Sequence, residues 1–115
     1  MDPNERSGVV RFAEAEGGIP GPDGERAILA LKRGTLDLKL SIPIPPNRQT
    51  PHEQDELYVV VRGGGVLVHD GKRDSFATGD ILFVAAGVEH HYEDFTLDLA
   101  LWRIFYGRSG GEIPE

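Results

Sequence analysis

The 115-residue chain has no cysteine and only one methionine and one tryptophan. Without cysteine, a disulfide framework, a thiolate nucleophile and a zinc ribbon are excluded, so any metal ion must be held by histidine, carboxylate, amide or water ligands. No apolar run approaches the roughly 20 residues that cross a bilayer as a helix. The polar, acidic first residues also lack the pattern of a secretory signal. We therefore expect a cytoplasmic protein with no membrane partner.

Basic residues are also scarce, since 12 Lys and Arg stand against 19 Asp and Glu and the net charge is −7. A surface that holds nucleic acid needs summed positive charge, so nucleic acid is not an expected partner. A chain of this length corresponds to one domain. No internal repeat or low-complexity segment divides it.

Glycine and proline are plentiful, with 15 and 8 residues, and they separate short apolar runs. Leucine and isoleucine alternate with polar residues from Leu36 to Ile44, which is the period of a half-buried strand. Gly34 precedes this run as a turn, and Asp70-Gly71 predicts a tight hairpin. Other expected strands cover residues 27–31, 57–62, 65–69, 81–84 and 97–106. The pattern predicts an all-β, antiparallel sandwich or barrel.

Three segments follow from these breaks in the pattern. Residues 1–24 show little periodicity and end in the turn-forming stretch from Gly17 to Gly24, so we interpret them as an N-terminal arm. Residues 25–107 contain all the expected strands and form the β-barrel domain. Residues 108–115 are polar and glycine-rich and form a loosely held C-terminal tail.

A polar cluster containing His52 and Glu56 precedes the apolar run from Leu57. Thr50-Pro51 followed by Glu53 also has the form of a helix start, which would place His52 and Glu56 one turn apart. We favour a strand, because three valines lead directly into glycines and leave a helix barely two turns long. Four extended residues span about 13 Å, so the chain must bend between His52 and Glu56 if both are to face one interior.

The second polar cluster carries a family resemblance. Its glycines, His90 and Asp94 match the second cupin motif, G-x5-P-x-G-x2-H-x3-N, with Ala85 for the proline and Asp94 for the asparagine. His52, Glu56 and Gly63 resemble the first cupin motif, H-x-H-x3-E-x6-G, in which Thr50 stands for the first histidine. Fifteen residues separate the motifs, as is typical of small single-domain cupins.

The resemblance implies a jelly-roll β-barrel, one divalent metal ion in its mouth and a homodimer. Carried over residue by residue, it makes His52, Glu56 and His90 the candidate metal ligands, with Gln54 as a possible neutral oxygen donor in place of the missing histidine. Such a set leaves open positions on an octahedral ion and is compatible with Fe, Mn, Ni or Zn. The arm around residues 9–12 is expected to pair with the partner subunit's sheet.

The expected function is a metal-dependent enzyme that acts on a small oxygen-bearing molecule, of the dioxygenase or the isomerase and lyase type. Glu56 would serve as ligand or base, and Tyr58, which shares its strand face, would orient the substrate. The alternative is a non-catalytic cupin that binds a small sugar or acid. A purely structural ion ranks last, because structural sites are normally closed by four protein ligands.

Overall fold

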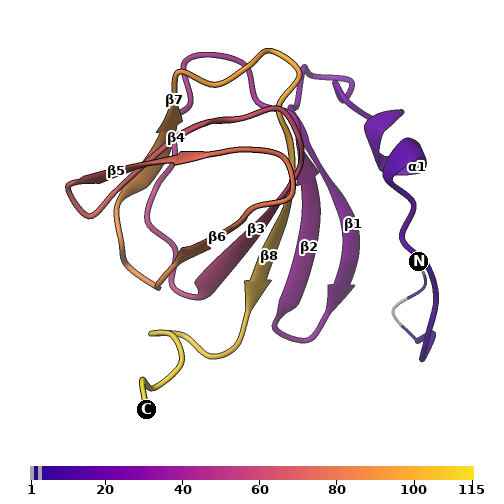
Figure 1. Cartoon of the computed structure of the whole chain (residues 1–115). Helices are drawn as coiled ribbons and strands as arrows, with labels where there is room; N and C mark the ends of the chain where they lie inside the picture. The colour runs from indigo at the N-terminus through magenta and orange to yellow at the C-terminus, as the bar shows by residue number, and fades with distance from the viewer. Residues whose placement is uncertain (1, 3) are drawn as a thin grey trace.

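In the computed structural model, which describes residue 2 and residues 4–115, eight antiparallel strands form two sheets that face each other (Figure 1). The larger sheet has the order β1-β2-β8-β3-β6 and the smaller one β5-β4-β7. The predicted all-β jelly-roll barrel is confirmed. The strands are β1 (Ala27–Arg33), β2 (Leu36–Ser41), β3 (Asp55–Arg62), β4 (Gly65–His69), β5 (Lys72–Phe76), β6 (Ile81–Val84), β7 (His90–Glu93) and β8 (Ala100–Tyr106).

Both predicted hairpin turns are present. Gly34 has a positive φ of 56° in the turn between β1 and β2, where Arg33 pairs with Leu36. Asp70 and Gly71 have φ values of 48° and 74° between β4 and β5, as a two-residue hairpin turn requires. Residues 50–54 contain no helix and bend at residues 53 and 54 before β3 begins, which confirms the strand interpretation.

The strands differ from the expectation most clearly at β7 and at the start of β8. β7 is a strand where a loop was predicted, because its sequence, His90-His91-Tyr92-Glu93, has no branched aliphatic residue to signal it. Only the alternation of buried His90 and Tyr92 with less buried neighbours gives it strand character. β8 begins at Ala100, three residues after the predicted start, because the Leu99 amide closes a turn onto the Thr96 carbonyl at 3.1 Å.

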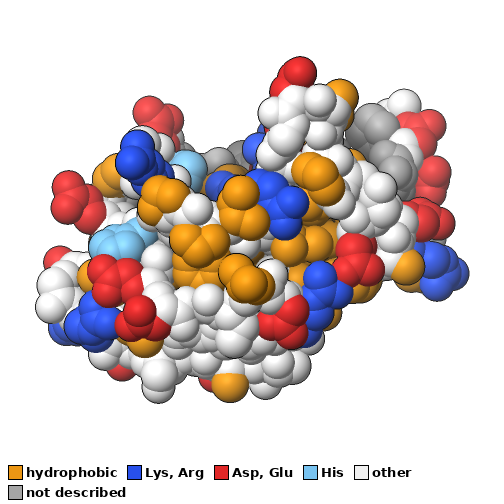
Figure 2. All heavy atoms as spheres, turned by 90° about the horizontal axis from the view of Figure 1, so that it is seen from above, with side chains coloured by type: hydrophobic (Ala, Val, Ile, Leu, Met, Phe, Trp, Pro, Cys, Tyr) orange, Lys and Arg blue, Asp and Glu red, His pale blue; other side chains and the backbone are white. Residues whose placement is uncertain are grey.

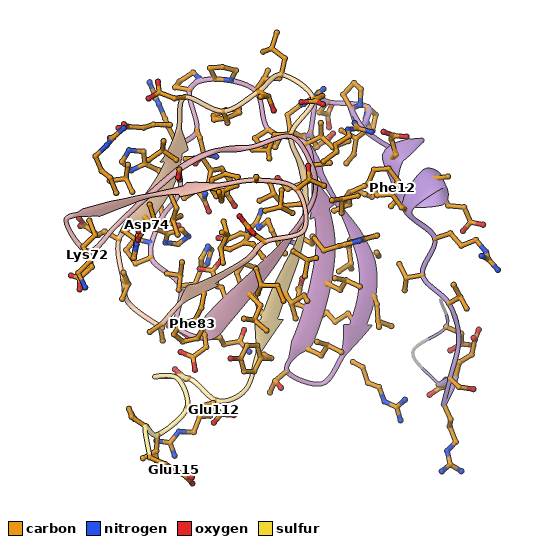
Figure 3. The ribbon with its side chains drawn as sticks, viewed as in Figure 1. Phe12, Lys72, Asp74, Phe83, Glu112 and Glu115 are labelled. Carbon is orange, nitrogen blue, oxygen red and sulfur yellow. The ribbon has the colours of Figure 1, made fainter. Side chains whose placement is uncertain are left out.

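The N-terminal segment contains a short helix, α1 (Phe12–Glu16), that the weak periodicity did not predict. Phe12 and Ala15, three residues apart, share one helix face and pack on the outer side of the larger sheet against Leu40 and Trp102. The Phe12 ring meets the Trp102 ring edge-on at 6.2 Å, and Figure 3 shows Phe12 between α1 and the sheet. No helix among the described residues is long and apolar enough to cross a membrane.

The main core fills the space between the two sheets. Its buried side chains come from both sheets and from the end of the β7–β8 connection, and they are Tyr58, Val60, Leu67, Phe76, Leu82, Val84, Tyr92, Leu99 and Leu101. Figure 2 shows the end of the barrel that lies at the top of Figure 1, where hydrophobic side chains gather in the middle and charged ones surround them. The exposed Ile44 and Leu97 belong to the loops that follow β2 and β7.

Candidate functional site

The candidate site lies inside the barrel, where β3 of the larger sheet faces β7 of the smaller one. Glu56 and Tyr58 occupy alternate positions of β3, so both point inward, and they are 1% and 0% exposed. His90 is the first residue of β7 and its side chain is fully buried. His52 precedes β3 in the loop, and its side chain is 30% exposed. The bend in that loop therefore brings residues of two motifs together.

Backbone contacts hold the two motif loops in place. The Gly87 amide donates a hydrogen bond of 2.8 Å to the His52 carbonyl, and the Ala86 amide donates one of 2.9 Å to Asp55 Oδ1. Asp55 is buried and also accepts a 2.8 Å bond from the Glu112 amide through Oδ2. The tail is thereby attached to the first residue of β3, which differs from the expected loose tail. The sequence offers no signal for this role of Asp55 except its place beside Glu56.

The four inward side chains form one polar cluster. Glu56 Oε1 lies 3.4 Å from His90 Nε2 and 3.9 Å from His52 Nε2. The Tyr58 hydroxyl is 2.5 Å from Glu56 Oε2 and 2.9 Å from His90 Nε2. It also lies 3.1 Å from Gln49 Oε1. Gln49, which the motifs did not indicate, thus reaches the cluster from the β2–β3 loop.

The cluster is rich in acceptors. His90 Nδ1 lies 3.0 Å from the Val88 carbonyl, which can only accept, so Nδ1 carries a proton, and a neutral ring would present a lone pair at Nε2. Glu56 Oε2, His90 Nε2 and Gln49 Oε1 then surround a single Tyr58 hydroxyl proton. One proton satisfies one acceptor well, and the other lone pairs lack a donor of comparable quality. An acceptor-rich interior of this kind suits a cation.

Two of these groups have shifted pKa values. Burial lowers the pKa of His52 below its ordinary 6.5, and the positive charges of Arg103 and Lys39 act in the same direction, although Glu56 opposes them. Burial raises the pKa of the Tyr58 hydroxyl far above its usual range, with nearby Tyr92 and Glu56 adding to the effect. His52 therefore favours the neutral, metal-binding form, and Tyr58 keeps its proton.

The donor chemistry fits a divalent cation. Neighbouring ligand atoms around an ion with bonds of about 2.1 Å lie roughly 3 Å apart, which is near the Glu56 to His90 separation. As the side chains stand, however, the described residues contain no group of three or more His, Cys, Asp or Glu side chains placed to hold a metal ion. The Tyr58 hydroxyl contacts Glu56 Oε2 and His90 Nε2, which are atoms that an ion would need. Metal and hydroxyl would compete for the same atoms.

Gln54 lies elsewhere than in this cluster. Its amide nitrogen donates to the carbonyls of Thr35 and Gly107 at 3.0 and 2.9 Å and so links the β1–β2 turn to the end of β8. Thr50, in the place of the motif's first histidine, lines the neighbouring cavity. His69 and His91 form pairs with Asp74 and Glu93 on the smaller sheet.

A cavity of about 230 Å³ adjoins His52. It opens between the β2–β3 loop, the end of β2, β7 and the middle of β8, and it is lined by Ser41, Asn47, Arg48, Gln49, Thr50, His52, Tyr92 and Arg103. Polar and cationic side chains therefore dominate its wall. Its size is below the roughly 300–1,000 Å³ of pockets for drug-sized ligands, so it suits a small molecule.

Comparison with known proteins agrees with the fold and the motifs. A family model described as "Cupin domain" matches residues 42–96, a range that contains His52, Glu56, Tyr58 and His90. The uncharacterized protein SCO3923 of Streptomyces coelicolor is 32% identical over 78 residues. That alignment covers 68% of this chain and 65% of the relative, so the chain spans just under two thirds of the relative's length.

Several solved structures have a similar fold. The plu4264 protein of Photorhabdus luminescens has a TM-score of 0.61 at 16% identity, with 71% of this chain and 72% of that chain covered. KdgF from Halomonas sp. also reaches 0.61 at 16% identity, with 69% and 76% covered. An RmlC-like cupin from Shewanella frigidimarina reaches 0.60 at 18% identity, with 69% and 72% covered. At such identities the likeness concerns the fold alone.

Proposed function

Because the chain belongs to the cupin superfamily, we propose that it binds one divalent metal ion through His52, Glu56 and His90 and acts as an enzyme on a small oxygen-bearing molecule. The observation that carries the proposal is the surplus of acceptor atoms around the Tyr58 hydroxyl. A bound cation would satisfy the lone pairs that one proton leaves without a donor. Fe, Mn, Ni and Zn all accept such ligands.

The residues of the chain have distinct parts in the proposed reaction. A divalent ion, when bound, supplies a Lewis acid next to the cavity. Tyr58 presents a protonated hydroxyl that orients a substrate oxygen by donating a hydrogen bond. Glu56 would be a ligand of that ion, and the Tyr58 hydroxyl, which donates to Glu56 Oε2 in the structure as it stands, would turn to the substrate once the ion holds the carboxylate. The buried walls around the cluster exclude water from the reacting groups.

Two variants test the metal site against matched controls. We expect metal analysis of tag-free protein, reconstituted with each candidate ion, to give equimolar metal for the wild type. His52→Ala and His90→Ala should lose it, because each removes a nitrogen ligand. His69→Ala and His91→Ala should keep it, because these histidines lie outside the cluster. A wild type that takes up no ion after reconstitution contradicts the metal proposal.

The second candidate function is binding of a small acid without chemistry. It is favoured by Thr50 in the place of a ligand histidine and by the Tyr58 hydroxyl, which already contacts Glu56 and His90. The two functions are distinguished by whether the protein converts the compound that it binds. An enzyme should convert a small oxygen-bearing compound in a reaction that chelation stops, whereas a binding protein should be stabilised by a ligand that it leaves unchanged. The homodimer and the cytoplasmic location stay predictions.

A further inference from the structure

Gln49 and Asn47 form a hydrogen-bonded pair in the β2–β3 loop beside the polar cluster. The Gln49 side-chain nitrogen donates to Asn47 Oδ1 at 2.9 Å, and the backbone amide of Tyr92 donates to the same oxygen at 2.8 Å. Both loop side chains are half-buried and line the cavity next to His52. The pair therefore attaches the loop to β7 at the place where the candidate site lies.

This attachment fixes which end of the Gln49 amide faces Tyr58. A backbone N–H can only donate, so the Asn47 atom that meets the Tyr92 amide must be its carbonyl oxygen. That oxygen can only accept, so the Gln49 atom that meets it must be the side-chain nitrogen. The other end of the same amide, Gln49 Oε1, therefore faces the Tyr58 hydroxyl at 3.1 Å.

Gln49 Oε1 is a second acceptor for the one proton of the Tyr58 hydroxyl. Glu56 Oε2 lies closer, at 2.5 Å, and a carboxylate is the stronger acceptor, so the proton points to Glu56 in the structure as it stands. The Tyr92 hydroxyl also lies near Gln49, but it makes no hydrogen bond of good geometry with the described residues. The Tyr58 proton can therefore turn to Gln49 by rotation of the hydroxyl alone.

We propose that Gln49 is a positioning residue, oriented by Asn47, that accepts the Tyr58 proton when a divalent ion binds. The Glu56 and His90 atoms that the hydroxyl now contacts would then be ligands of the ion. A hydroxyl that turns to Gln49 keeps a hydrogen bond, and it directs its oxygen lone pairs instead of its proton at the cation. Gln49 thereby ends the competition between hydroxyl and ion.

Gln49 also connects the polar cluster to the cavity. It lines the cavity wall and contacts the Tyr58 hydroxyl, so a hydroxyl that has turned to Gln49 points toward the side from which a substrate would enter. A substrate oxygen would then replace the Gln49 carbonyl as the acceptor. This role deepens the proposed function, on which it rests for the presence of the ion.

The test measures the affinity of chelator-treated protein for Mn²⁺, Ni²⁺ and Zn²⁺, and for Fe²⁺ under nitrogen, by titration calorimetry. Gln49→Met is similar in size but has no acceptor oxygen. It should weaken binding of the preferred ion by about five- to tenfold, because one neutral hydrogen bond of the metal-bound state is lost. Gln54→Met is the matched control and should bind the ion as the wild type does, because Gln54 links strand ends outside the cluster.

A cycle of double variants separates this role from a merely structural one. Tyr58→Phe should bind the ion more tightly than the wild type, because no hydroxyl has to leave Glu56. In the Tyr58→Phe background, Gln49→Met should change the affinity no further, because no proton is left for the carbonyl to accept. In the wild-type background, Asn47→Leu should weaken binding as Gln49→Met does, whereas Asn47→Asp, which keeps an acceptor for both donors, should not.

Three results would overturn the assignment. It is wrong if Gln49→Met binds the ion as tightly as the wild type, or if the effect of Gln49→Met is the same with and without the Tyr58 hydroxyl. It is also wrong if Tyr58→Phe binds the ion more weakly than the wild type, because the hydroxyl would then assist binding. Urea denaturation of the chelated variants checks that each is folded. If Gln49→Met does not fold, the comparison of Asn47→Leu with Asn47→Asp decides.

The same titrations distinguish this failure from failure of the proposed function. If neither the wild type nor Tyr58→Phe takes up an ion, the metal function is rejected and the role of Gln49 with it. If both take up an ion and Gln49→Met has no effect, the metal function stands and only the role of Gln49 is rejected. Uptake by Tyr58→Phe alone would also reject that role, because Gln49 would then fail to draw the hydroxyl away from Glu56.

Discussion

Two buried tyrosines differ in what their hydroxyls do. The rings of Tyr58 and Tyr92 meet edge-on at 5.7 Å, and both are almost fully buried. The Tyr58 hydroxyl has Glu56, His90 and Gln49 as partners, whereas the Tyr92 hydroxyl lies near Gln49 and Tyr58 but makes no hydrogen bond of good geometry with the described residues. Replacing each tyrosine by phenylalanine therefore compares the loss of a hydrogen-bonded hydroxyl with the loss of one that makes no good hydrogen bond.

We expect Tyr58→Phe to lower the free energy of unfolding of the metal-free protein by about 1–3 kcal/mol, because it leaves the buried Glu56 carboxylate without its closest donor. Tyr92→Phe should change that free energy little, because no hydrogen bond is lost. Urea denaturation of chelator-treated protein, followed by fluorescence, measures both. Equal losses for the two variants would show that the Tyr58 contacts contribute nothing specific.

At the scale of the elements, the turn between β3 and β4 depends on close backbone approach. Gly63 has a φ of 80°, and a Cβ atom there would lie 2.4 Å from Thr96 Oγ1 and 2.9 Å from the Leu99 Cα. The last glycine of the first motif thus lets the turn pass against the β7–β8 connection. Gly71 has a similar φ of 74°, but a Cβ there would meet nothing within 4 Å.

We therefore expect Gly63→Ala to cost more stability than Gly71→Ala. Both carry the strain of a positive φ, of order 1–3 kcal/mol, and only Gly63→Ala adds a backbone clash. The difference between their thermal unfolding midpoints isolates the clash. Similar midpoints would mean that the β7–β8 connection moves at little cost to accommodate the added Cβ atom.

At the scale of the whole molecule, the outer face of the larger sheet is apolar and only partly covered. Along it, Phe83 pairs with Leu57 and Leu57 with Ile104, while Ile81 pairs with Val59 and Val59 with Trp102. Helix α1 covers the Trp102 side of this face. Ile81 and Phe83, at the β6 edge, are 65% and 54% exposed, and Figure 3 labels Phe83 there.

We propose that a second copy of this chain covers the exposed part of this face. The paired positions carry no charged side chain, so an apolar partner surface fits this face best. A second copy of the chain offers an identical apolar face, and the two faces can meet in a two-fold contact. Sedimentation velocity should show a dimer for the wild type and a monomer for the double variant Ile81→Ser, Phe83→Ser. The exposed Leu97→Ser, in the β7–β8 connection, is the control and should stay dimeric. A monomeric wild type would contradict the proposal.

Much of this protein follows from the sequence alone. The alternation from Leu36 to Ser41 predicts a strand and the Asp70-Gly71 turn predicts a hairpin, because these signals depend on near neighbours in the chain, and the resemblance of the two motifs to those of cupins implies the barrel. The motifs single out His52, Glu56 and His90, and strand alternation adds Tyr58; these four side chains do lie together. Their role as ligands stays a prediction.

Only the tertiary structure decided the surroundings of these residues. Helix α1 and strand β7 exist through packing against distant strands, and their own residues do not signal them. Gln54 joins strand ends and Gln49 joins the cluster because the loop bends after His52. Tyr92 and Arg103 line one cavity because two sheets close together, and proximity between such distant residues leaves no local pattern in the sequence.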